Sequence, residues 1–430
     1  MAEDTFLSDD LLRQLMSVGE VDLLVGITSH SSAQAIRQAM QVIEQSFQQN
    51  FVRQRVVIVN IDGGGPKDEA EVSAGNSDGQ PEGNPHVPIL TSLRTVHHVT
   101  ARFSGTPSQG TALRTVLAAS DLLQARACAI VSPTTSNLTP QWIANLLRPA
   151  YRDNFDFVAP LYTRHKYQGL LARILLYPMS RAVFGKRIRE LFADEWGFSG
   201  RLGTHCLNQN VWHEAAIHSR PEAWMAVSAI SSDYRCCQAF LGPKPQPPTG
   251  SGPDIVEAIR QTVGTFFWCL ETRAGSWLER EGSEPVPTFG PEHELTSEPV
   301  ELNLQRMFEL FCSGVKELEP ILSTVLERET HAEIMDIVAV DAKTFRFGAD
   351  LWVRTLYDFA SSYHHQVMNR DHLVQALVPL YRGKIYSFLQ EHANSSPEEM
   401  EEANERLCLE FERQKLYLRE RWTKRVEVKV

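Results

Sequence analysis

Apolar positions in the first sixty residues change from a continuous run to helical spacing and back again. Residues 21–27 (VDLLVGI) are apolar without alternation, which predicts a strand buried on both faces of a parallel sheet. Residues 33–50 predict an amphipathic helix, and a second strand is expected at 56–61. Together these segments predict a β-α-β unit with a right-handed crossover. The apolar face of its helix consists of Ile36, Met40, Ile43 and Phe47.

The same alternation of strands and helices continues to about residue 160. Strands are predicted at 96–103, 127–131 and 157–161, and helices at 111–123 and 140–151. This order indicates a doubly wound α/β sheet. Residues 63–88 interrupt the pattern, because they are rich in Gly, Pro, Glu, Asp, Asn and Ser and have almost nothing apolar to bury. They predict a disordered surface loop.

The second half of the chain has a different pattern. Proline and glycine crowd residues 243–253 (PKPQPPTGSGP), which predicts a linker. We therefore expect one domain at about 1–250 and an all-α domain at 251–430. Helices are predicted at 255–280, 302–329, 349–368, 370–391 and 397–421. The last of these is densely charged, and such a charge run is most often a solvated face.

Composition restricts the class of protein. The chain has 430 residues, 43% of them hydrophobic, which is enough for two domains with cores of their own. A net charge of −11 argues against sequence-independent nucleic-acid binding. No apolar run approaches the ~20 residues that span a bilayer. The seven cysteines form no C-x-x-C pair and the N-terminus is acidic, so we expect reduced thiols and a cytoplasmic protein.

Two polar clusters follow predicted strands and could carry chemistry. Arg164, His165 and Lys166 come directly after the strand at 157–161, where ligands bind in open α/β sheets. Their cations suit a carboxylate or phosphate, although a solvent-facing basic loop would look the same. Asp194 and Glu195 precede an aromatic, glycine-containing turn. They could orient an acceptor or stabilise charge, or simply begin a capped helix.

Seven short motifs occur in an order that resembles GT-A retaining glycosyltransferases of the glucosyl-3-phosphoglycerate, glucosylglycerate and mannosylglycerate synthase kind. The resemblance covers roughly residues 20–250, and the helical remainder is similar to the C-terminal extension of some bacterial members. The motifs are Gly26-Ile27-Thr28-Ser29-His30, Gly110-Thr111-Ala112-Leu113-Arg114, Leu138-Thr139-Pro140-Gln141-Trp142-Ile143, Val158-Ala159-Pro160-Leu161-Tyr162-Thr163-Arg164-His165-Lys166-Tyr167, Gly185-Lys186-Arg187, Trp196-Gly197-Phe198-Ser199-Gly200 and Leu241-Gly242-Pro243-Lys244.

The resemblance implies a GT-A-like, Rossmann-type domain that transfers a sugar from a nucleotide-sugar donor to a small anionic, glycerate-like acceptor. Glu195 falls where the family has an acid beside the reacting sugar, and Asp194 is the neighbouring candidate for catalysis. The implied donor-binding residues are Thr28, His30, Asp62, Gln109, Gly110, Ser132, Thr134 and Lys244. The implied acceptor-binding residues are Arg164, His165, Lys166 and Tyr167.

The chain departs from this family at the subsite for metal and diphosphate. Ser132 and Thr134 stand where the family has an Asp-x-Asp pair, and Gln246 stands where it has a histidine ligand. Gln109 stands where the family usually has a lysine near the diphosphate. Hydroxyl and amide groups are poor replacements for the ligands of Mg²⁺ or Mn²⁺. We therefore expect weak or lost metal dependence and name no metal ligand.

Three functions remain open on the sequence. The first is a glycosyltransferase with little or no need for metal. The second is a catalytically inactive protein on a degenerate transferase scaffold, with a binding or regulatory role. The third is a structural or oligomerisation role, in which the helical domain would bind a second copy or another protein.

Overall fold

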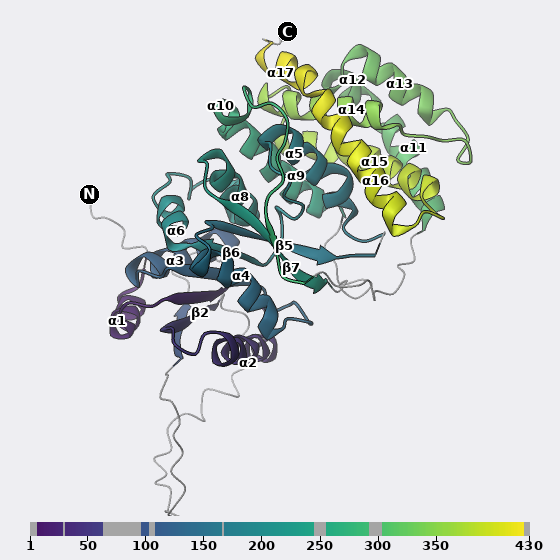
Figure 1. Cartoon of the computed structure of the whole chain (residues 1–430). Coiled ribbons are helices and arrows are strands. Elements are labelled where there is room, and N and C mark those ends of the chain that lie inside the picture. Colours follow the sequence, from purple (N-terminus) through teal and green to yellow (C-terminus); the bar gives the residue numbers. More distant parts are fainter. Residues whose placement is uncertain are drawn as a thin grey trace, which may run out of the picture.

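The computed structural model describes residues 7–28, 31–62, 96–102, 108–165, 167–244, 255–291 and 303–424. The loop predicted at 63–88 lies outside these residues, as does most of the linker predicted at 243–253. Figure 1 shows a sheet surrounded by helices, with the helices of the C-terminal third gathered at one end of the molecule.

The centre of the fold is an eight-stranded sheet with the order β3-β2-β1-β4-β6-β5-β7-β8. All its pairings are parallel except those of β6, which runs antiparallel to both β4 and β5. The carboxyl ends of β1, β4, β5 and β7 therefore meet the amino end of β6 at one edge. The strands are β1 (Leu23–Ile27), β2 (Val56–Asp62), β3 (His97–Arg102), β4 (Ala127–Val131), β5 (Phe157–Thr163), β6 (Trp196–Ser199), β7 (Cys236–Pro243) and β8 (Thr288–Phe289).

The central strands lack alternation because helices cover both faces of the sheet. Every residue of β1 and β4 is buried. Leu23 and Val25 of β1 face a core shared with α2 and α4, whereas Leu24 faces the core that includes α3 and α8. The helices of this half are α1 (Asp9–Val18), α2 (Ala33–Asn50), α3 (Gln109–Leu122), α4 (Pro140–Arg152), α5 (Tyr177–Phe184), α6 (Gly200–Leu207), α7 (Ala215–Ser219) and α8 (Pro221–Ser231).

The chain after residue 254 is almost entirely helical. Its helices are α9 (Ile255–Thr272), α10 (Ala274–Trp277), α11 (Leu304–Glu317), α12 (Glu319–Val325), α13 (Arg328–Val338), α14 (Ala349–His364), α15 (Arg370–Glu391), α16 (Pro397–Arg413) and α17 (Lys415–Thr423). The single helix predicted at 302–329 is divided, because Pro320 in the first turn of α12 starts a new helix. The helix predicted at 397–421 is divided at Gln414.

The expected fold class is confirmed at the level of architecture: a mixed α/β sheet is followed by a helical region. The division at residue 250 stays a prediction. The segment after it adds β8 to the sheet, and one hydrophobic cluster extends from Met179 of α5 to Phe411 of α16. Within the described ranges, every helix is too short or too polar to cross a membrane.

Candidate functional site

The parallel strands place several predicted site residues at one edge of the sheet. Thr28 follows β1, Ser132 follows β4, Arg164 follows β5 and Lys244 follows β7. Strands β2 and β3 lie on one side of β1 in the sheet, and β4 lies on its other side. The direction in which strands are added therefore reverses between β1 and β4. Ligands of open α/β sheets bind at such a reversal, outside the carboxyl ends of the strands.

Glu195 is at the centre of a buried polar cluster at this edge. Because β6 is antiparallel, its amino end lies beside the carboxyl end of β4, with Trp196 opposite Ile130. The Glu195 side chain is 0% exposed. Its Oε1 accepts a hydrogen bond from the Thr135 hydroxyl, and its Oε2 accepts one from the Tyr162 hydroxyl and one from Lys244 Nζ at 2.9 Å. Both carboxylate oxygens are thus engaged by the protein.

Asp194, unlike Glu195, is accessible to solvent, because its side chain is 46% exposed. Lys244 Nζ lies 3.1 Å from its Oδ2, and Arg220 lies 3.6 Å from its Oδ1. Burial of the carboxyl alone would raise the pKa of Asp194, but Lys244 and Arg220 outweigh it and lower the pKa. Burial likewise opposes the charge of Lys244, and Glu195 and Asp194 outweigh it and raise the pKa of the lysine.

Two hydroxyl side chains, those of Ser132 and Thr134, lie just after β4, where the sequence analysis expected the metal subsite. Ser132 Oγ and Thr134 Oγ1 lie 2.7 Å apart and hydrogen-bond to each other. Among the described residues, no three His, Cys, Asp or Glu side chains converge as metal ligands. Gln246 lies outside the described residues. The described residues of this subsite therefore do not fit Mg²⁺ or Mn²⁺, which favour several oxygen ligands that include carboxylates.

A cavity of about 900 Å³ begins at Tyr162 and extends from β5 to α16. Arg164 borders it and forms a two-pronged ion pair with Glu190, at 2.8 and 3.2 Å. Its guanidinium also lies 5.1 Å from the centre of the Tyr162 ring. Gly169 has a φ of +63°, and a Cβ there would approach Arg164 Cδ to 2.8 Å. The left-handed backbone and the close approach therefore both favour glycine beside this arginine.

An irregular helical turn forms the next part of the cavity wall. Residues 172–176 form a π-helix that leads into α5, and Arg173 of this turn borders the cavity. Wide turns of this kind disturb the regular backbone ladder and are frequent at functional sites. Here the carbonyl of Ile174 accepts a hydrogen bond of 2.8 Å from the indole of Trp352 in α14. The helical region therefore fixes the turn that carries Arg173.

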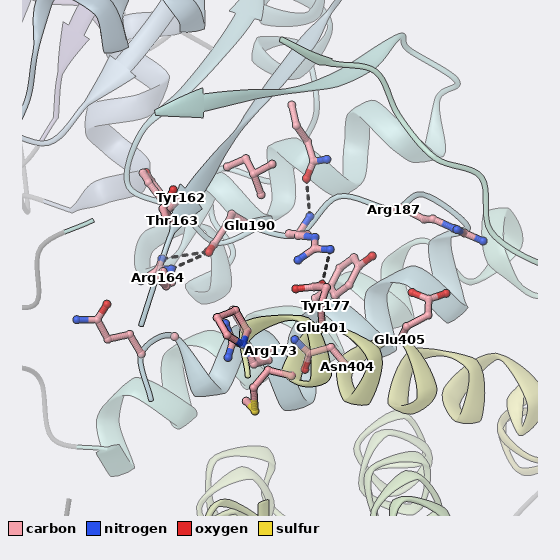
Figure 2. Close-up of a pocket in the computed structure, with 18 of the residues that line it drawn as sticks. Tyr162, Thr163, Arg164, Arg173, Tyr177, Arg187, Glu190, Glu401, Asn404 and Glu405 are labelled. Atoms are coloured by element: carbon pink, nitrogen blue, oxygen red, sulfur yellow. Dashed lines mark hydrogen bonds and ion pairs between the residues drawn. The ribbon is translucent and has the colours of Figure 1, made fainter. Parts of the chain in front are cut away.

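Helix α16 forms the far wall of the cavity through its acidic side chains (Figure 2). Glu401 pairs with Arg189 at 2.5 Å, and Glu405 pairs with the fully buried Arg181 at 2.6 Å. Glu412 pairs with the same arginine at 2.8 Å. The charged helix predicted at 397–421 is therefore not simply a solvated face, because its first turns pack on the sheet half.

The structure brings some predicted residues together and separates others. His165 borders the cavity, and the rings of His165 and Tyr167 pack edge to face at 5.1 Å. Gly110 lies in the first turn of α3 against the backbone of Ile217, where a Cβ would not fit. Gln109 begins the same helix and is exposed. Asp62 ends β2. His30 and Lys166 lie outside the described residues, and so does the side chain of Asp62.

The sequence analysis did not identify four residues that complete the site. Thr135 and Tyr162 bind Glu195, Arg220 lies beside Asp194, and Glu190 holds Arg164. Tyr162 could have been found, because it stands near the end of a buried strand two residues before Arg164. Arg220 and Glu190 come from segments whose sequence gives no sign that they approach this edge.

Comparison with known proteins adds little to this geometry. No protein-family model matches the chain, and no curated protein matches it. Two similar solved structures are one titled as a mycobacterial protein and the M. tuberculosis glucosyl-3-phosphoglycerate synthase. Each is 14% identical to this chain with a TM-score of 0.38. The match to the first covers 62% of this chain and 78% of that structure, and the match to the second covers 60% and 84%. Similarity this weak supports no conclusion about activity.

Proposed function

We propose that the protein transfers a sugar from a nucleotide-sugar donor to a small anionic acceptor, with little or no need for a metal. The observation that carries this proposal is the junction of two sites at Tyr162. On one side lies the cluster of Glu195, Asp194 and Lys244 at the strand ends, and on the other lies the arginine-lined cavity. A donor and an acceptor held on the two sides would meet there.

The donor would bind outside the carboxyl ends of β1 and β4. Hydroxyls of Thr28, Ser132 and Thr134 would contact it, and Lys244 would offset the charge of the departing diphosphate. The other donor contacts expected from the sequence are His30, Asp62, Gln109 and Gly110. In the reaction, an acceptor hydroxyl oxygen bonds to the anomeric carbon as the bond from that carbon to the diphosphate breaks, and one proton is released.

The two neighbouring carboxylates would have different roles. Asp194 is half exposed and can reach a bound sugar, so we assign it the contact with the reacting sugar. Glu195 is enclosed and bound by three donors, so it positions Tyr162 and Lys244. Arg164, His165, Lys166 and Tyr167 would bind the anionic group of the acceptor.

The first test is thermal-shift binding of a panel of nucleoside diphosphate sugars, each with and without Mn²⁺. We expect stabilisation by one nucleotide, independent of metal. Turnover then tests the acceptor side: Arg164→Ala should raise the KM for the acceptor at least about tenfold, because a charged hydrogen-bonding partner is lost. Arg152→Ala, on the exposed end of α4, is the matched control. An unchanged KM would refute the role of Arg164.

A second candidate function is ligand binding without transfer. The mutual hydrogen bond of Ser132 and Thr134 favours it, because these hydroxyls satisfy each other without a ligand. This alternative predicts that a nucleotide sugar stabilises the protein while no acceptor is glycosylated, with or without metal. Clean turnover of any donor would exclude it.

A further inference from the structure

A buried amide on the far wall of the cavity has no partner for its oxygen. Asn404 of α16 is 6% exposed and borders the cavity. Its Oδ1 makes no hydrogen bond to any residue that the structure describes. Buried polar atoms are nearly always satisfied, and an unsatisfied one destabilises the fold. Figure 2 shows Asn404 beside Glu401, on the same wall of the space that Tyr177 borders.

The neighbouring groups on this wall are acceptors as well. The carboxylates of Glu401 and Glu405 lie on either side of Asn404 along α16, although each already binds an arginine. Amide and carboxylate oxygens accept hydrogen bonds from hydroxyl groups. This wall therefore suits a ligand rich in hydroxyls rather than a second anion.

Arginines also border the cavity, among them Arg164. Figure 2 shows Arg173 between Arg164 and Glu401. Arg173 is also part of the lining, and burial lowers the pKa of its guanidinium. An anionic group beside these two arginines would gain charge-assisted hydrogen bonds.

The cavity is larger than a three-carbon acid needs. Pockets of roughly 300–1,000 Å³ enclose ligands of drug size, and the volume here, about 900 Å³, is near the upper end of that range. A three-carbon acid bound at Arg164 would leave most of the cavity filled with water. It would also leave Asn404 without a partner.

We propose that the acceptor is a hexose-sized sugar acid, carboxylated or phosphorylated, and that α16 forms its specificity wall. The anionic group binds at Arg164 and Arg173, and ring hydroxyls donate to Asn404 Oδ1 and Glu401. This inference rests on the proposed function for the identity of the ligand as an acceptor. It assigns to the helical region a part of substrate binding.

Calorimetric titration of the full chain without any donor tests this assignment. The probes are D-glucuronate and D-glucose 6-phosphate, each compared with its three-carbon counterpart, D-glycerate or 3-phosphoglycerate, and with inorganic phosphate. At least one six-carbon acid should bind about tenfold more tightly than its counterpart, since one satisfied buried acceptor accounts for that factor. Whether the carboxylate or the phosphate binds identifies the anionic group.

Three variants locate the contact. Asn404→Leu should weaken binding of the six-carbon acid about tenfold and leave the three-carbon acid unchanged. Glu402→Gln lies on the same helix with its side chain 73% exposed, and it should change neither. Arg164→Met, at a side chain that is 21% exposed, should weaken both classes, and it keeps the test decisive if Asn404→Leu does not fold.

Equal affinity for six-carbon and three-carbon acids, no binding of either six-carbon acid, or an unchanged affinity in Asn404→Leu would overturn the inference. Its failure is distinguishable from failure of the proposed function. If a three-carbon acid is glycosylated and Asn404→Leu has no effect, only the inference fails. If a six-carbon acid binds through Asn404 while no nucleotide sugar is turned over, the binding site stands and the proposed transfer fails.

Discussion

Replacing Lys244 with methionine tests whether the cluster at Glu195 is held together by charge. Among the described residues, Lys244 is the only cation bonded to the Glu195 carboxylate, which is 0% exposed. After the substitution Glu195 keeps its hydrogen bonds from Thr135 and Tyr162. Removing one partner of a buried ion pair costs about 3–5 kcal/mol. Because two neutral donors remain, we expect a loss near the lower limit, about 3 kcal/mol. Asp194 adds little, because its half-exposed carboxylate regains water.

The double variant Lys244→Met/Glu195→Gln separates charge from packing. With both charges removed, no uncompensated carboxylate is left, so the loss should fall to about 1 kcal/mol. Glu195→Gln alone should cost about 1 kcal/mol, because Lys244 keeps Asp194 as its partner. The coupling energy between the two sites is then about 3 kcal/mol, at the upper end of the range for contacting residues. Lys316→Met, at an exposed position of α11, is the matched control and should be neutral.

Amide hydrogen exchange in β5 and β6 is the suitable assay. It reports the free energy of opening at the cluster without treating a 430-residue chain as a single two-state unit. The reasoning is refuted if Lys244→Met leaves this protection unchanged. It is also refuted if the losses of the two single variants simply add in the double variant.

Two further substitutions test other parts of the account. Burial raises the pKa of Glu222 from 4.5 to about 7, although Arg220 acts in the opposite direction. The contribution of Glu222 to folding stability is therefore complete at low pH and is lost as pH rises through about 7. Urea unfolding of the unsubstituted protein should therefore show a loss of stability between pH 5 and 8, and in Glu222→Gln this loss should be smaller by up to about 3 kcal/mol. An unchanged pH profile would contradict this. Arg181→Met should cost about 2 kcal/mol, below the usual value for a buried pair because Glu405 is 48% exposed. It should raise amide exchange in α16 more than in α13, and equal protection in both proteins would show that the arginine does not hold α16.

The strands and helices of the sheet half could be predicted because their patterns are local. The strand at 127–131 is apolar throughout, and the helix predicted at 140–151 has a proline in its first turn and a threonine cap that accepts from Trp142. Strand β6 was not predicted, because four residues within an acidic and glycine-containing segment resemble a turn. Its antiparallel insertion between β4 and β5 depends on contacts distant in sequence.

The part of the candidate site that could be predicted consists of residues that directly follow parallel strands. Ser132, Arg164 and Lys244 follow parallel strands, and such positions share one edge of a sheet. The pairing of Glu195 with Tyr162 and Lys244 could not be predicted, since it joins residues 33 and 49 positions apart through a strand that was not recognised. The acidic start of α16 has the composition of a solvated helix, and only the buried Arg181 opposite it reveals an interface.

The central claim is that this edge of the sheet transfers a sugar without a metal. The most direct measurement is release of nucleoside diphosphate from a panel of nucleotide sugars, with sugar acids as acceptors, in EDTA and in Mn²⁺. The account predicts turnover of one donor at a rate that EDTA leaves unchanged. No turnover with any pair, or turnover that occurs only with the metal, would contradict it.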